Sequence, residues 1–404
     1  MKLSLANLRL ASSLASASAA LLALLAAAGC SSASSTEEPS QSEGALASDR
    51  PPQFVLLAFD GSLNLDFWRE SRQFAKTAGV KFTYFISGTY FLADAKKTSY
   101  QGPHHAAGKS DIGFGGDAAA IKARLEQLRL ARSEGHEMGS HANGHFDGTA
   151  WTSADWESEF QAFDKLIFQA GPMNGFAQPN IGFALPDVVG FRAPLLGQGP
   201  GLYTTLSGHH YLYDTSKTAA VDYWPEKKNG VWNFPLAQLR VVGSGKKTLS
   251  MDYNFYFTQS NGVSKPENKE LYKKEMLDTY MQYFETNYFG NRAPVNIGHH
   301  FSKWNGGAYW EAMQTFAKRV CGQPEVKCVT YKELMAFVEA NADKVPAWKA
   351  GQFNKMPKPP SAGEAAEIEP AVADEDLEAA GFVRDGVHAH EEETGGSVAE
   401  IPAP

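Results

Sequence analysis

The chain has 404 residues, of which 12% are aromatic and 20% are charged, and its formal net charge is -8. This acidic balance, with no evident basic face, argues against a nucleic-acid partner, because binding to phosphates requires clustered Lys and Arg side chains. The length allows one large domain or two small ones.

The N-terminus has the pattern of a secretory signal. Lys2 and Arg9 provide a basic start, a segment rich in Ala, Leu and Ser follows, and residues 27–30 read Ala-Ala-Gly-Cys. This ending resembles a lipobox, so we expect residues 1–30 to be a signal peptide and Cys30 to carry a lipid that binds the membrane. The mature chain would then be an envelope lipoprotein, in the periplasm or at the cell surface. An ordinary cleaved signal and a retained membrane anchor are the alternatives.

Strand and helix patterns alternate through the next part of the chain. Residues 31–52 are rich in Ser, Glu and Pro and are predicted to form a tether. Residues 54–59 form a continuous apolar run, which is typical of a buried strand in a parallel sheet, and Asp60 follows it. Further strands are expected over residues 80–86, 136–139, 188–191 and 211–214, and helices over residues 66–75, 118–133 and 153–169. This rhythm predicts parallel strands with helices outside.

The later part continues the pattern less regularly. Strands are expected over residues 230–236, 294–298 and 329–331, and helices over residues 267–287, 307–320 and 332–340. Cys321 and Cys328 form a pair in an expected exported chain, which indicates a disulfide. From about residue 346 the chain is rich in Pro, Ala and Glu, so we expect residues 346–404 to be an acidic, disordered tail. Residues 53–345 remain as the folded domain.

Residues able to carry chemistry fall at or just after the ends of the expected strands. Asp60, His141, Arg192 and His299 all have this position. In barrels of alternating strands and helices, the carboxyl ends of the strands carry the functional site. The predicted fold is therefore α/β, a distorted (β/α) barrel, with its site at that mouth.

Residues 140–145 read Ser-His-Ala-Asn-Gly-His and carry two histidines four residues apart. We expect His141 and His145 on one side of a helical turn, where two imidazole nitrogens can converge on one metal ion. Alone, this spacing is a weak signal, because a helix can carry such a pair on its surface. Four other histidines, at positions 104, 105, 209 and 210, lie in expected loops and receive no role.

The order of these motifs resembles that of the NodB-type polysaccharide deacetylases, carbohydrate esterase family four, and most of all their chitin-deacetylase-like branch. That family has a strand ending in Phe-Asp-Asp, then Ser-His-x-x-x-His, an Arg-x-Pro turn, a later Asp and a final strand ending in His. The matching residues here are Phe59-Asp60, Ser140-His141 with His145, Arg192 with Pro194, Asp214, and His299-His300. The resemblance covers nearly all of the expected folded domain.

The resemblance implies a role for each matching residue. Asp60 would be the general base, Arg192 would keep its carboxylate ionised, and the turn after Arg192 would lend a backbone N–H to the oxyanion. His141 and His145 would bind a divalent metal ion, expected to be zinc. Asp214 would support the acid histidine by favouring its protonated form.

Two histidines compete for the role of the acid. Alternation along the strand places His299 on the same face as Val295 and Ile297, whereas the spacing from Pro294 to Trp304, compared with chitin-deacetylase-like chains, favours His300. We expect one of the two to be the acid and the other to pack or cap, with a slight preference for His300.

Gly61 is the main departure from the family pattern, because the family has a second Asp there that binds the metal. Two imidazoles with waters hold a divalent ion less tightly than a site that adds a carboxylate. Recruitment of Asp60, substitution by a side chain such as Asp147, and loss of the metal are all open. Structural roles are open as well: Asp60 as a helix cap, Arg192 as a buried ion-pair partner, and Asp214 as a turn residue.

These features predict a metal-dependent hydrolase of carbon–nitrogen bonds other than peptide bonds. It would remove N- or O-acetyl groups from a cell-envelope or extracellular polysaccharide. The alternative, motivated by Gly61, is a non-catalytic deacetylase-like lipoprotein that binds glycan. A metal-free amide hydrolase acting on a small cyclic substrate is a third and less favoured interpretation.

Overall fold

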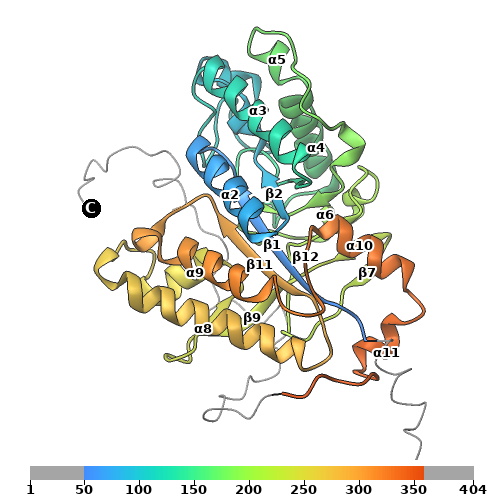
Figure 1. Ribbon diagram of the computed structural model, residues 1–404. Coiled ribbons are helices and arrows are strands. Elements are labelled where there is room, and N and C mark those ends of the chain that lie inside the picture. Colours follow the sequence, from blue (N-terminus) through green and yellow to red (C-terminus); the bar gives the residue numbers. More distant parts are fainter. Residues whose placement is uncertain (1–49, 359–404) are drawn as a thin grey trace, which may run out of the picture. The chain divides into compact units, whose positions relative to one another are not determined.

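The computed structural model describes residues 50–358, in which strands and helices alternate (Figure 1). The first part contains β1 (Gln53–Gly61), α2 (Leu65–Ala78), β2 (Phe82–Ile86), α3 (Ala118–Ser133), β3 (Glu137–Ser140), α4 (Ser153–Phe168), α5 (Ala170–Met173), β4 (Gly190–Phe191), α6 (Pro200–Leu206) and β5 (Tyr213–Asp214). The second part contains β6 (Thr218–Ala219), β7 (Glu226–Lys228), β8 (Val231–Asn233), β9 (Leu236–Arg240), β10 (Lys247–Leu249), α7 (Asp252–Ser260), α8 (Lys269–Tyr288), β11 (Val295–His300), α9 (Trp304–Val320), β12 (Val326–Cys328), α10 (Tyr331–Ala340) and α11 (Val345–Lys349).

Side-chain caps fix the starts of the first three long helices. Asn64 accepts hydrogen bonds from two backbone N–H groups of α2, Asp117 accepts one from α3, and Thr152 forms a capping box with Asp155 at the start of α4. Such caps satisfy N–H groups that have no partner inside the helix. The helices expected over residues 118–133 and 153–169 are thereby confirmed to within one residue.

The main sheet has the strand order β11-β1-β2-β3-β4-β5-β8, with every neighbouring pair in this series parallel, and β7 antiparallel to β8. Parallel neighbours need long crossover connections, which helices provide from β1 to β5. The register pairs Asp60 of β1 with His300 of β11, and Ser140 of β3 with Phe191 of β4. The carboxyl ends of these strands therefore meet at one edge.

A smaller sheet completes the barrel between β5 and β11. Strand β9 pairs with β6 in parallel and with β10 antiparallel. Met251, just after β10, forms a parallel bridge to Gly298 of β11. The Asn296 side chain of β11 also donates to the carbonyls of Phe234 and Pro235, just before β9. The expected distorted (β/α) barrel is confirmed, with its irregular part between β5 and β11.

Alternation along β1 separates two apolar clusters. Leu57 and Phe59 belong to the large cluster that includes residues of α2, α3 and α4. Ala58 belongs to a second cluster that includes Tyr331 at the start of α10. Because successive side chains of a strand point to opposite faces, Asp60 shares the face of Ala58.

Helices α8 and α9 pack side by side (Figure 1).

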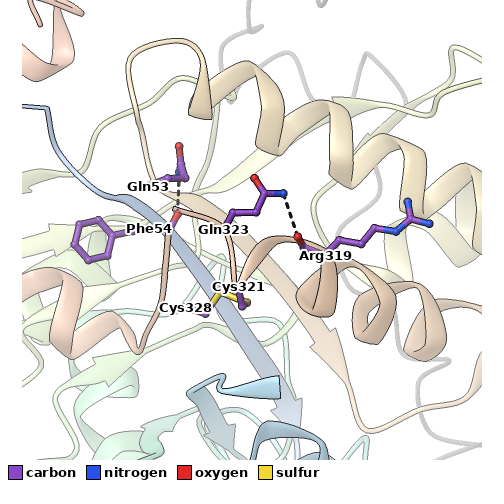
Figure 2. The surroundings of a disulfide bond; sticks show 6 residues. All are labelled: Gln53, Phe54, Arg319, Cys321, Gln323 and Cys328. Atoms are coloured by element: carbon purple, nitrogen blue, oxygen red, sulfur yellow. Dashed lines mark hydrogen bonds between the residues drawn. A yellow bond between two sulfur atoms is a disulfide. The ribbon is translucent and has the colours of Figure 1, made fainter. Parts of the chain in front are cut away.

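The expected disulfide between Cys321 and Cys328 is present and joins the end of α9 to β12. Figure 2 shows it beside the start of β1, where the Gln53 side-chain amide donates to the Phe54 carbonyl at 3.0 Å. Strand β12 pairs with this same end of β1. The disulfide therefore ties the C-terminal part of the domain to the sheet.

The strand expected over residues 329–331 is wrong. The strand lies earlier, over Val326–Cys328, and Thr330 forms a capping box with Glu333 at the start of α10. The physical reason is that the Thr-x-x-Glu pattern supplies two hydrogen bonds to a helix start, which outweigh the strand preference of Val329 and Tyr331.

The folded chain continues past residue 346, where the sequence predicted the start of a disordered tail. Trp348 of α11 is 4% exposed and its ring stacks on Phe337, and Phe353 is 8% exposed. Two buried aromatic side chains explain why this segment packs on the domain. The signal peptide, Cys30, most of the tether and residues 359–404 lie outside the described residues. No helix within residues 50–358 is long and apolar enough to cross a membrane.

Candidate active site

The residues singled out in the sequence gather at the carboxyl ends of the strands. Asp60 is the last residue but one of β1, and His141 and Arg192 directly follow β3 and β4. Asp214 and His300 are the last residues of β5 and β11. The barrel thus presents these side chains at the mouth where such folds carry their chemistry.

A buried ion pair connects β1 with the turn after β4. Nη1 of Arg192 donates a 2.9 Å hydrogen bond to Oδ1 of Asp60, and neither side chain is exposed. Arg192 also donates from Nε to the Thr215 hydroxyl at 2.8 Å and from Nη2 to the Tyr331 hydroxyl at 3.0 Å. Its guanidinium lies 4.6 Å from the centre of the Phe85 ring. These contacts orient the guanidinium and favour the ionised form of Asp60.

His141 and His145 lie on a loop, so the expected helical turn is wrong. Ala142 and His145 have left-handed backbone conformations, with φ of 50° and 59°, which do not continue a right-handed helix. Nδ1 of His141 lies 2.8 Å from the Arg192 carbonyl oxygen, which leaves Nε2 on the opposite side of the ring. The rings of His141 and His145 are 5.2 Å apart and line one pocket. The loop therefore brings both rings to one pocket without a helical turn.

Glu159 of α4 anchors this loop. Its Oε1 accepts hydrogen bonds from the Asn143 backbone N–H and from the Tyr100 hydroxyl, both at 3.0 Å. The Tyr100 hydroxyl in turn accepts from the Gly144 N–H at 3.1 Å. Burial, opposed by these hydrogen bonds, raises the pKa of Glu159 to about 7. The carboxyl that holds the loop is therefore expected to change its charge near neutral pH.

Glu159 is expected to make stability depend on pH. Since burial raises its pKa from 4.5 to about 7, its contribution is complete below the lower value and is lost as the pH rises through the higher one. Glu159→Gln cannot titrate. We therefore expect the unfolding free energy of the wild type, relative to this variant, to fall by about 3 kcal/mol between pH 4 and pH 8. Urea unfolding measures the difference, and the same difference at both pH values would contradict the expectation.

His300 lines the pocket, whereas His299 lies on the opposite face of β11. Nδ1 of His300 lies 2.7 Å from Oδ1 of Asp252, and its backbone N–H donates to Oδ2 at 2.8 Å. His299 packs near Phe59, and its Nε2 lies 3.4 Å from the Tyr280 hydroxyl. Strand alternation does place His299 with its apolar neighbours, but those belong to the cluster on the helix side of the strand. His300, and not His299, therefore lies at the pocket.

Asp252, the first residue of α7, is the carboxylate beside both histidines. Burial alone would raise the pKa of its carboxyl, but the adjacent His300 and His299 hold that pKa below its usual range. An ionised carboxylate on Nδ1 favours the protonated imidazole and fixes its orientation. The carboxylate beside His300 is therefore that of Asp252, whereas Asp214 was expected there.

Asp214 lies elsewhere at the mouth. Its carboxylate accepts from the Ser216 hydroxyl at 2.5 Å and from the Tyr203 hydroxyl at 3.3 Å. The Ser216 oxygen accepts from the Ala193 backbone N–H at 2.8 Å. Burial raises the pKa of Asp214 to about 6. The structure does not bring Asp214 to His300 but makes it a support of the turn after Arg192.

The pocket at this mouth offers imidazoles to a metal ion. It is lined by Gly61, Ser87, Tyr90, Ile112, His141, His145 and His300. Imidazole nitrogens are ligands that zinc and other transition metals prefer. Gly61 supplies no ligand, and the exposed Asp147 accepts instead from the N–H and hydroxyl of Thr149, at 2.9 and 2.6 Å. The pair His141 and His145 fits a divalent transition metal, while the third ligand of the family pattern is missing.

The backbone at Gly61 also explains why an aspartate does not fit here easily. Its φ is 97°, a conformation that costs an L-residue about 1–2 kcal/mol. We therefore expect Gly61→Ala to lower the unfolding free energy by about 1–2 kcal/mol, and Gly61→Asp to lower it further, because the aspartate also buries a carboxylate beside Asp60. Urea unfolding of both variants tests this, with the alanine separating backbone strain from added charge. Wild-type stability in either variant would contradict the argument.

When the chain is compared with known proteins, similar chains are found among solved structures. No family model matches the chain, and no curated protein matches it. A polysaccharide deacetylase of Mycobacterium smegmatis, described as putative, is 12% identical with a TM-score of 0.47, over 77% of this chain and 95% of that one. A probable polysaccharide deacetylase of Pseudomonas aeruginosa PAO1 is 14% identical with a TM-score of 0.45, over 73% and 93%. A carbohydrate esterase family four pseudoenzyme of Bacillus anthracis is 11% identical with a TM-score of 0.38, over 70% and 66%.

All three are described as members of the class that the order of motifs in this chain resembles. The strand order found above is that of the expected barrel. The fold is α/β, a distorted (β/α) barrel. Likenesses at these identities and TM-scores carry no information on activity, so the function has to be argued from the residues of this chain.

Three residues of this candidate site were not predicted from the sequence. Asp252 begins α7, just after the short strand β10, and neither element was expected from the sequence. Glu159 is a charged residue on the buried face of α4, between Trp156 and Phe163. Tyr331 gave no signal, because its contact with Arg192 joins residues 139 positions apart.

Proposed function

We propose that this chain is a metal-dependent deacetylase that hydrolyses N- or O-acetyl groups of a cell-envelope or extracellular polysaccharide. The observation that carries the proposal is the meeting of three features at one mouth of the barrel: the Asp60–Arg192 pair, the His141 and His145 rings, and the His300–Asp252 pair. Hydrolysis of an amide or ester needs a base, an acid and stabilisation of the oxyanion. In this chain, all three can come from that mouth.

His141 and His145 would hold the divalent ion, for which zinc is the expected species. When bound, such an ion supplies a Lewis acid for the acyl oxygen and lowers the pKa of a water molecule. His141 is oriented for this role by the contact of its Nδ1 with the Arg192 carbonyl, 2.8 Å away.

Asp60 is the proposed general base. Its carboxylate is buried and bonded to Arg192, which favours the ionised form that can take a proton from the attacking water. Thr215 and Tyr331 hold the guanidinium on its other sides, so Asp60 has a fixed partner. Because the Asp60 carboxylate is held in one orientation, it is already positioned to accept the proton.

His300 is the proposed general acid, which gives its proton to the leaving amine or alcohol. Asp252 holds Nδ1, and the imidazole lines the pocket. The turn after Arg192 contributes a backbone N–H to the oxyanion. Leu195 and Leu196 in this turn have left-handed φ of 56° and 52°, a conformation that persists only where the surroundings fix it.

We also propose that a lipid on Cys30 anchors the domain to a membrane of the cell envelope, in the periplasm or at the cell surface. The support is the sequence Ala-Ala-Gly-Cys at residues 27–30 after a basic start and an apolar segment. Polysaccharide of the envelope would then lie within reach of the barrel mouth.

Acetate release tests the proposal directly. The full chain, supplied with zinc or cobalt, is incubated with N-acetylated chito-oligosaccharides and with O-acetylated xylan. We expect acetate from at least one substrate and a loss of about 100-fold or more in the double variant His141→Ala/His145→Ala. His105→Ala is the matched control, since His105 is exposed and stacks on Phe146. Absence of acetate from both substrates with either metal would overturn the proposal.

A non-catalytic, deacetylase-like glycan-binding lipoprotein is the second candidate, and Gly61 is the observation that favours it. A chain of this kind would bind the same oligosaccharides in calorimetry without releasing acetate, and it would hold no stoichiometric metal at His141 and His145. Metal analysis of the purified chain and of the double variant therefore separates the two candidates.

A further inference from the structure

A second group of histidine and carboxylate side chains lies outside the pocket described above. Asp164 belongs to α4, and His209 and His210 follow α6, which packs against α4. One donor atom from each of these three side chains lies within 4.8 Å of the other two. None of the three lines the pocket at the barrel mouth.

His209 connects the two elements. Its Nε2 lies 3.1 Å from Oδ2 of Asp164, and its Nδ1 lies 3.2 Å from both oxygens of Glu157, two turns earlier on α4. Its backbone N–H donates to the Thr205 carbonyl at 3.0 Å. The imidazole is 8% exposed and therefore occupies a fixed place between α4 and the chain that enters β5.

His210 and Asp164 each keep a shielded polar atom without a hydrogen-bond partner among residues 50–358. These atoms are Nε2 of His210 and Oδ1 of Asp164. His210 also has a left-handed φ of 72°, which costs a residue with a side chain about 1–2 kcal/mol in the absence of compensation. Its ring lies 4.8 Å from that of His209. The backbone thus holds a second imidazole beside the first.

We propose that Asp164, His209 and His210 form a binding site for a divalent transition-metal ion. Two imidazoles and one carboxylate are a donor set that zinc, copper and nickel prefer. Calcium and magnesium are disfavoured, because they select oxygen ligands. In a tetrahedral site with metal–ligand bonds of about 2.0–2.1 Å, donor atoms lie about 3.4 Å apart. Small side-chain rotations would bring the three donors to that spacing.

The simpler interpretation is that a protonated His209 bridges Glu157 and Asp164 as an ion pair. Burial alone would lower the pKa of His209. The carboxylates of Asp164 and Glu157 outweigh this effect and raise that pKa. This bridge leaves His210 unexplained. A metal ion accounts for both histidines and for the Asp164 carboxylate.

An ion at this site would clamp α4 to the segment that enters β5. Helix α4 carries Glu159, which anchors the loop of His141 and His145, and β5 ends at Asp214. The site would therefore be structural, and it would act on two elements that support the barrel mouth. The inference does not depend on the deacetylase proposal, because none of its ligands belongs to that site.

The inference is tested by measuring metal binding in a variant that lacks His141 and His145. The full chain without an affinity tag carries His141→Ala/His145→Ala, is stripped with a chelator and is then titrated with Zn²⁺ or Co²⁺. We expect one equivalent of zinc to remain after dialysis, a Co²⁺ absorption spectrum typical of low coordination number, and a melting temperature raised by several degrees with zinc. Adding His210→Gln or Asp164→Asn should weaken zinc binding at least tenfold.

Two controls make the result decisive. His105→Gln changes an exposed histidine elsewhere and should leave zinc binding unchanged. Glu157→Gln removes a carboxylate from His209 but none of the three proposed ligands, so zinc should still bind. The proposal is overturned if the double variant His141→Ala/His145→Ala retains no zinc. It is also overturned if adding His210→Gln or Asp164→Asn leaves zinc binding as tight as in the double variant, with the fold confirmed by circular dichroism.

Discussion

Replacing Asp60 by asparagine is expected to reduce the rate of acetate release about a thousandfold, within the range found for loss of a general base. The asparagine cannot take the proton from the attacking water. It also leaves the Arg192 guanidinium buried without its carboxylate, which is expected to lower the unfolding free energy by about 3 kcal/mol. Kinetics of acetate release and urea unfolding measure the two effects separately.

Tyr331→Phe is the matched control for this experiment. It removes one hydrogen bond to Arg192 and leaves the Asp60–Arg192 pair in place. We expect its activity to stay within about tenfold of the wild type. A folded Asp60→Asn variant with more than a tenth of the wild-type activity would exclude Asp60 as the base.

The variant Asp252→Asn is expected to lower turnover about a hundredfold and to change its pH dependence. Without the adjacent negative charge, the imidazole of His300 loses its proton at lower pH. The alkaline limb of the pH–rate profile should therefore move to lower pH. Profiles of kcat from pH 5 to pH 10 measure this displacement, which a merely structural role would not produce.

Asp214→Asn provides the comparison, because Asp214 was expected in the role that we propose for Asp252. We expect this variant to keep the wild-type position of the alkaline limb, since its carboxylate bonds Ser216 and Tyr203. A larger displacement in Asp214→Asn than in Asp252→Asn would reverse the assignment of the two carboxylates.

Elements with local signals could be predicted from the sequence. Helices α3 and α4 have a cap and apolar residues at helical spacing, and β1 has a continuous apolar run. Each pattern specifies its element within a short window, so distant parts of the chain are not needed to find it. The strand ends then located Asp60, His141 and Arg192.

The segment between β9 and α8 could not be predicted in this way. Helix α7 has no side-chain cap, and its residues Tyr253, Asn254, Phe255 and Tyr256 are all buried, so no apolar stripe repeats at helical spacing. A helix buried on all sides lacks the periodicity that reveals helices at a surface. Asp252 was missed because it begins this helix.

The loop of His141 and His145 shows a different limit. A spacing of four residues fits a helix, and nothing within residues 140–145 excludes one. The loop is decided by partners far away in the chain: the Arg192 carbonyl at His141 and the Glu159 carboxylate at Asn143. Residue types identified the pair, whereas tertiary contacts determined its backbone.

The hydroxyl of Tyr331, at the start of α10, reaches the guanidinium that orients Asp60. Asp60, Arg192 and Tyr331 are thus joined across almost the entire length of the domain. During synthesis on a ribosome, the N-terminal two thirds of the chain cannot assemble this triad, because its last member has not yet emerged. Shortened products that stop before residue 331 also lack the buried side chains of α10, such as Leu334 and Val338, and are therefore expected to be unstable even where their first strands have paired.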